Sequence, residues 1–314
     1  MTEYFLLALD AVLPFIIYMS FGYMVVHLFK MAEENFLRKL NTMVFKCFFP
    51  LLMFNNFYNM DLSQGFDIMP LLFTLAALLV MLPLLFLLVP RFSSGPQRTG
   101  VMIQALFRSN SILFAMPLSE AVCGAAGTAA STKLVAVIVP LFNVMAVIAL
   151  EKYNGKHSSV WSLVKNVLTN PLILGAIAGG ICLLLKVSLP APVEKTVKAF
   201  ADLTTPISLF ILGGTLHFTT VGKNAKALTV CTLLKLIFIP MIIVTGLALT
   251  PFTSAEKFAV FCLFGTPVAV SSYTMAANMG GDGDLAGEFV AVTTITSLFT
   301  LFGWIFIMKM TGLI

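Results

Sequence analysis

The chain has 314 residues, of which 59% are hydrophobic and only 11% are charged, and its formal net charge is +5. A soluble domain carries roughly 25% charged residues, so this composition excludes an ordinary soluble protein and predicts an all-α polytopic membrane protein in the lipid bilayer. The positive charge is then expected on loops at one membrane face rather than on a surface for nucleic acid, and no nucleic-acid partner is predicted.

Apolar stretches divide the chain into ten predicted membrane spans. A helix needs about 20 mostly apolar residues to cross the hydrocarbon core. The stretches that satisfy this requirement lie near residues 5–29, 38–59, 68–90, 99–119, 131–150, 162–185, 194–216, 226–249, 256–278 and 286–310. The loops between them are short, and the longest polar stretch, at residues 151–166, lies near the middle of the chain.

The two halves of the chain resemble each other. A shift of 156 residues without gaps aligns similar residues: Lys30 with Lys186, Lys39 with Lys195, Pro50 with Pro206, and Gly124 with Gly280. We therefore predict two five-helix repeats, residues 1–150 and 167–314, joined by a cytoplasmic connector at 151–166. Because each repeat has an odd number of spans, the second must enter the membrane from the opposite side, as in many secondary transporters. The Lys and Arg counts of the loops favour both termini outside.

The fourth and the ninth span are each interrupted by helix-breaking residues at corresponding places. Arg108, Ser109, Asn110 and Ser111 interrupt the fourth span, and the same shift aligns the last three with Gly265, Thr266 and Pro267 of the ninth. Paired interruptions indicate a transporter's binding site, since a broken helix exposes backbone groups that hydrocarbon cannot satisfy. The start of a half-helix also favours an anion.

Arg108 lies about ten residues inside its span. A mid-membrane charge costs several kcal/mol, at least ~2.5–3.5, and indicates a functional site, and a guanidinium can hold a carboxylate with two hydrogen bonds. An internal acid partner or an interfacial anchor would be the alternative role. The predicted anion-binding residues are Arg108, Ser109, Asn110, Ser111, Thr266 and Pro267, with Asn55 and Asn56 of the second span, which otherwise serve as a helix C-terminal cap.

Three segments give the chain a family resemblance: "RSNSILFAMPL" in the fourth span, "TNPLILGAIAG" in the sixth and "GTPVAVSSYTMAANMGGD" in the ninth. Together they resemble the auxin efflux carrier family, which includes plant auxin exporters and bacterial carboxylate permeases. The resemblance implies a fold similar to bile-acid/sodium symporters, with spans 1, 2, 6 and 7 as a scaffold, spans 3–5 and 8–10 as a core, and crossing helices 4 and 9. It also implies elevator-like alternating access and a homodimer formed through the scaffold.

The function that follows is secondary transport of a small organic anion, such as malonate, malate or an auxin-like acid. The short connector at residues 151–166 differs from the long loop of plant carriers, so a permease of the bacterial inner membrane is the closer analogy. The alternative is a sodium-coupled symporter of a larger amphipathic acid. No enzyme motif, P-loop or metal motif is present in the sequence, so neither an enzyme nor a cofactor is predicted.

Several polar residues are candidates for coupling to H⁺ or Na⁺. They are Glu120, Thr128, Thr132, Asp282 and Glu288, for the last two of which a solvated turn is the alternative interpretation. Lys46 and Lys235 lie inside spans and are expected to pair internally or to reach an interface, and Asp10 is expected at the outer headgroups. The three histidines lie too far apart in sequence to indicate a metal site.

Overall fold

The structure is a computed structural model that describes residues 2–59, 68–155 and 160–314. Every regular element in these residues is a helix, as the composition predicts. The remaining residues, 1, 60–67 and 156–159, include part of the central connector and His157, so the prediction for them lies outside the described residues.

Helices follow one another through both halves of the chain. The first half contains α1 (Thr2–Tyr23), η1 (Met24–Leu28), α2 (Glu34–Met43), η2 (Val44–Phe48), α3 (Phe49–Tyr58), α4 (Ile68–Phe92), α5 (Pro96–Phe107) and α6 (Ser111–Lys152). The second half contains α7 (Val160–Leu168), α8 (Pro171–Leu184), α9 (Ala191–Thr215), α10 (Phe218–Leu233), η3 (Leu234–Phe238), α11 (Ile239–Ala248), α12 (Ser254–Gly265), α13 (Ser271–Asn278) and α14 (Gly283–Met310). The three η elements are π-helical turns: η1 ends the helix that begins with α1, whereas η2 and η3 lie within longer helices.

Six helical stretches among the described residues are long and apolar enough to cross a membrane: Ala8–Leu28, Ile68–Phe92, Ser111–Lys152, Ala191–Thr215, Val221–Ala248 and Gly283–Met310. The chain is therefore a multi-pass membrane protein. The four other predicted ranges, 38–59, 99–119, 162–185 and 256–278, coincide with shorter helices or with helices joined across a break or a π-helical turn. The total of ten spans stays a prediction.

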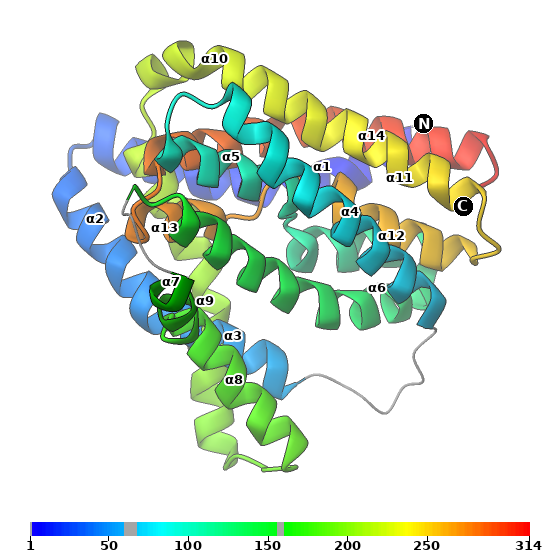
Figure 1. The fold of residues 1–314 in the computed structure, drawn as a ribbon, viewed down its shortest axis with the longest axis horizontal. Coiled ribbons are helices and arrows are strands. Elements are labelled where there is room, and N and C mark those ends of the chain that lie inside the picture. The colour runs from blue at the N-terminus through cyan, green and yellow to red at the C-terminus, as the bar shows by residue number, and fades with distance from the viewer. Residues whose placement is uncertain (1, 60–67, 156–159) are drawn as a thin grey trace.

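Close helix packing without intervening side chains joins α1 to α9 and α3 to α8. A Cβ atom on Gly213 would lie 1.9 Å from the carbonyl oxygen of Met19, and one on Gly175 would lie 2.2 Å from that of Pro50. Only glycine permits these approaches. In Figure 1, α3 and α8 lie together at the lower end of the molecule, apart from α10, α11 and α14 along the top.

Unusual backbone conformations recur at the interval of 156 residues. Lys30 and Lys186 both have positive φ, 54° and 52°, and no other described residue except glycine does. Gly124, which interrupts α6, and Gly280 also have positive φ, 63° and 81°. A left-handed lysine is uncommon. A lysine pair and a glycine pair with positive φ at the same separation are therefore hard to attribute to chance. The separation agrees with the predicted offset between the halves.

Candidate anion-binding site at the helix crossing

The two predicted interruptions meet in space. Between α5 and α6, residues 108–110 run past residues 266–270 between α12 and α13, and these two segments are called the crossing below. Ser109 and Val268 form an isolated antiparallel bridge, and the Asn110 N–H donates to the carbonyl oxygen of Pro267 at 2.8 Å. Both segments are buried throughout. The backbone groups that each broken helix exposes are thus partly satisfied by the other segment.

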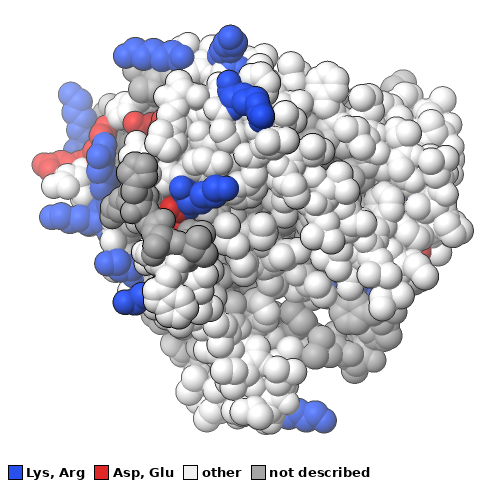
Figure 2. Space-filling view, viewed as in Figure 1, with Lys and Arg blue, Asp and Glu red and all other residues white. Residues whose placement is uncertain are grey.

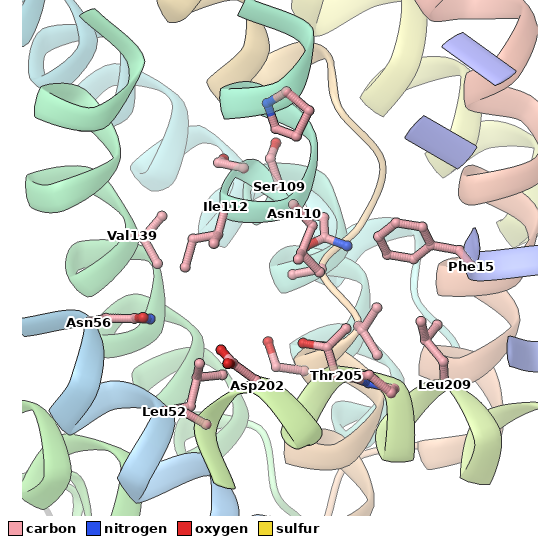
Figure 3. Close-up of a pocket in the computed structure, with 18 of the residues that line it drawn as sticks. Phe15, Leu52, Asn56, Ser109, Asn110, Ile112, Val139, Asp202, Thr205 and Leu209 are labelled. Carbon is pink, nitrogen blue, oxygen red and sulfur yellow. The ribbon is translucent and has the colours of Figure 1, made fainter. Parts of the chain in front are cut away.

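A cavity of about 690 Å³ lies against one side of the crossing, where its other walls come from α1, α3, α6 and α9. Six of the predicted binding residues line it: Arg108, Ser109, Asn110, Ser111, Asn55 and Asn56. Thr266 and Pro267 lie in the crossing but are not among the lining residues, and Ala269, Val270 and Ser271 line the cavity from that segment instead. Figure 3 shows Ser109, Asn110 and Ile112 across the cavity from Asp202, Thr205 and Leu209 of α9.

Arg108 is only 3% exposed, which excludes an interfacial position for its side chain in this structure. Its guanidinium donates to the Asn143 amide oxygen and, at 2.7 Å, to the sulfur of Met275. Among the described residues, no carboxylate lies within ion-pair distance of it. The arginine therefore lacks the internal acid that was its alternative partner. A buried charge without a counter-charge is costly.

Three further donors at the cavity wall have no hydrogen-bond partner among the residues that the structure describes. They are the Asn110 and Asn56 side-chain amide nitrogens and the Ser111 hydroxyl. Asn110 is 7% and Ser111 1% exposed, so bulk water reaches neither side chain freely. An unsatisfied buried donor costs about 1–3 kcal/mol. A ligand rich in acceptor oxygens would satisfy these donors and the arginine together.

The amides at the end of α3 divide into cavity and cap residues. Asn59 is the C-cap residue of α3 and donates through its side chain to the backbone and side-chain oxygens of Asn55. Asn55 and Asn56 line the cavity. The capping role that was their alternative therefore belongs to Asn59.

Two carboxylates also line the cavity. Asp202 of α9 is exposed and forms an ion pair with Lys198 at 2.7 Å. Asp10 of α1, expected only at the headgroups, also lines the cavity and is exposed. Because water screens exposed charges, these acids weigh less on a bound anion than the buried Arg108. Their exposure also shows that the cavity reaches the protein surface on that side.

The coupling candidates do not gather at one place around this cavity. Asp282 caps α14 through the Leu285 N–H at 3.0 Å and pairs with Arg98 at 3.3 Å, which is a structural role at a helix start. Glu288 is buried and accepts from Asn224 at 2.7 Å, with its second oxygen unpartnered. Glu120 and Thr132 are exposed, and the Thr132 hydroxyl donates to the carbonyl oxygen of Thr128. Within the described residues no cluster of metal-ligating side chains occurs.

Two side chains that contact the crossing were not predicted from the sequence to do so. Asn143, which accepts from Arg108 and donates to Met53, is a lone amide within the apolar run "VPLFNVMAVIAL". A single polar residue at mid-span was the signal that could have identified it. Lys235 is buried and donates to the Ser109 hydroxyl, in agreement with internal pairing, whereas Lys46 is exposed.

An all-helical multi-pass protein with two broken helices that cross beside a polar cavity has the architecture of a membrane transporter. A family model described as membrane transport protein matches residues 7–160 and 152–305, nearly the whole chain. The chain therefore belongs to this family, the auxin efflux carrier family, and the predicted family membership is confirmed. The family is one of transporters rather than enzymes. No curated protein matches the chain.

Proposed function

We propose that the protein is a secondary transporter of a small organic anion, a mono- or dicarboxylate of the size of malonate or malate, which binds in the 690 Å³ cavity. The main support for this proposal is that Arg108 is a buried cation at the cavity wall with no carboxylate partner among the described residues. A carboxylate can accept two parallel hydrogen bonds from a guanidinium. The free donors of Asn110, Ser111 and Asn56 complete the set of groups that favour an anion.

Helix dipoles act in the same direction as the arginine. The first residues of α6 and α13, Ser111 and Ser271, both line the cavity. A helix N-terminus carries about half a positive elementary charge and N–H groups without intrahelical partners. Two such ends facing one cavity favour negative charge there without a further charged side chain.

The transport cycle in this proposal follows the predicted domain arrangement. The two halves form inverted five-span repeats, supported by the paired left-handed residues Lys30 and Lys186. The scaffold comprises α1, α2, α3, α7, α8 and α9, and the core contains the crossing. The core then carries the anion past the scaffold between the two membrane faces. A homodimer through the scaffold helices completes the arrangement.

Surface charge supports an orientation with both termini outside. Figure 2 shows Lys and Arg side chains gathered over the end of the molecule at which Figure 1 places α2 and the start of α10. Exposed basic residues at these and neighbouring helix ends are Arg38, Lys39, Arg91, Lys152, Lys223 and Lys226. Both chain ends lie toward the opposite side (Figure 1). Basic residues favour the cytoplasmic face, so in this proposal the termini face outward from a bacterial inner membrane.

The test is a thermal-shift titration of the purified protein with malonate, malate, succinate, lactate and indole-3-acetate. A ligand that binds only the native state raises the apparent stability by mass action. We expect one class of these acids to stabilise the protein, and Arg108→Gln to weaken that binding by about 2–5 kcal/mol, the cost of truncating one partner of a buried charge pair. Exposed Arg91→Gln is the matched control and should bind as the parent does.

Stabilisation that survives Arg108→Gln unchanged would give the arginine a structural role and contradict the proposed site. No response to any acid would contradict the carboxylate class itself. A response that appears only in sodium buffer would favour the sodium-coupled symporter instead.

A further inference from the structure

Lys235 is a second buried cation at the crossing, on a helix that does not line the cavity. It lies in the π-helical turn η3 and is 1% exposed. Its ammonium donates to the Ser109 hydroxyl, and no carboxylate among the described residues lies within ion-pair distance of it. An ammonium has three donors, so this hydrogen bond alone does not offset the cost of burying the charge. A Lys235 side chain that stays charged therefore needs a further negative potential nearby.

The ends of two half-helices provide that potential. α5 ends at Phe107 and α12 ends at Gly265, both directly before the crossing, and η3 packs against both helices. A helix C-terminus carries about half a negative elementary charge on carbonyl groups without intrahelical partners. Two such ends sum to about one negative charge, which a single ammonium balances.

The crossing therefore has two electrostatic sides. The starts of α6 and α13, with Arg108, line the cavity, whereas α5 and α12 pack against η3, whose Lys235 reaches Ser109 just after the end of α5. In transporters built from broken helices, such carbonyl ends are where a coupling cation is coordinated. Here the Lys235 ammonium bonds to Ser109, just after the end of α5.

We infer that Lys235 is a built-in cation that takes the place of a bound coupling cation behind the crossing, so that the crossing is assembled without sodium. Lys235 then acts as a positioning residue: its ammonium holds Ser109 and the helix ends in register while Arg108 and Asn110 bind the anion from the other side. The inference rests on the proposed function only where it concerns coupling. The charge balance at the crossing can be tested in the protein without substrate.

A neighbouring feature agrees with a fixed lysine. The π-helical turn disturbs the regular hydrogen-bond ladder of its helix, and the Trp304 indole N–H donates to the Leu236 carbonyl oxygen next to Lys235 at 2.9 Å. The turn is thereby tied to α14 as well as to the crossing. Lys46 provides the contrast, because it lies in the equivalent type of turn, η2, but is exposed and far less constrained.

The experiment measures the thermal stability of the purified protein without substrate in choline, sodium and ethylammonium chloride at equal ionic strength. Ethylammonium is the probe for the missing lysine head group. We expect the parent to be equally stable in all three salts. Lys235→Ala should lose several degrees in choline chloride and recover them, in a saturable manner, with ethylammonium and in part with sodium. Lys46→Ala is the matched control and should show no rescue.

A folded Lys235→Ala variant whose stability responds equally to all three salts would overturn the inference. If this variant does not fold, the inference is tested with the parent and with Lys235→Arg, which keeps the charge. Both should bind the carboxylate identified above as tightly in choline as in sodium chloride, and sodium-dependent binding by the parent would also overturn the inference. Cation rescue without any carboxylate binding would contradict the proposed function but leave the role of Lys235 standing.

Discussion

Two helices are interrupted at the same place in the molecule, by residues 108–110 and by residues 266–270. These two segments, each with the helix start that follows it, contribute different chemistry. The first segment supplies Arg108 and the unpartnered donors of Asn110 and Ser111 to the cavity. The second supplies mainly backbone: the Pro267 carbonyl oxygen accepts from Asn110, and the Thr266 hydroxyl is bonded within its own helix to the Cys262 carbonyl oxygen at 2.9 Å. Corresponding breaks can thus share the geometry while only one places unpartnered side-chain donors at the cavity.

This difference predicts that Asn110→Ala lowers carboxylate affinity more than any other substitution of a neutral residue in the crossing. The side chain makes no capping bond to α6, so the fold loses little, but a bound carboxylate loses a buried donor. Such a hydrogen bond to a charged group is worth about 1.5–3 kcal/mol. We expect carboxylate affinity to fall roughly 10–100-fold, as measured by the thermal-shift titration described above.

Asn59→Ala is the control, since Asn59 caps α3 and bonds to Asn55 rather than to the crossing. It should change affinity by less than about threefold. Equal losses in the two variants would move the binding site from the crossing toward the end of α3.

The glycines that follow the two breaks should, in contrast, behave alike. Gly124 and Gly280 have φ of 63° and 81°, and a Cβ atom would meet nothing within 4 Å at the first and only Asn154, at 3.5 Å, at the second. Alanine at either position therefore adds backbone strain without a clash, which costs roughly 1–3 kcal/mol. Both variants should show similarly lower midpoints of thermal inactivation.

Gly303→Ala is the matched control, because Gly303 lies inside α14 with open space around its Cβ position. There alanine should stabilise the helix by up to ~1 kcal/mol. Destabilisation at only one of Gly124 and Gly280 would weaken the argument that the halves are equivalent.

The sequence predicted the existence of both breaks and the position of Arg108, because polar residues, Gly and Pro within an apolar run are costly in an unbroken membrane helix. It did not predict which residues touch. The shift of 156 residues pairs Ser109 with Gly265, whereas the backbone bridge pairs Ser109 with Val268. An internal alignment identifies equivalent positions, but contacts depend on how two segments pass each other in space.

The same limit applied to the side chains that contact the crossing. Asn143 reaches Arg108 from 35 residues away, and Lys235 reaches Ser109 from 126 residues away. Neither distance can be read from local periodicity. Thr266 was predicted to bind ligand because it lies in the break. Its hydroxyl instead donates to the carbonyl oxygen of Cys262, four residues earlier. The polarity of a residue does not show that its hydroxyl already has such a backbone partner.

The smallest expected effects separate stability from binding at the two breaks. Thr266→Val replaces a fully buried hydroxyl by a methyl group and leaves the Cys262 carbonyl oxygen without this bond, at a cost of about 0.5–1.5 kcal/mol of stability. Since Thr266 does not line the cavity, affinity should stay unchanged. Ser111→Ala should do the reverse, because its hydroxyl has no partner among the described residues and Ser111 lines the cavity. Its affinity should fall roughly 2–10-fold with unchanged stability. Loss of affinity in Thr266→Val would mean that the second segment also binds the anion directly, and the contrast between the two breaks would then be wrong.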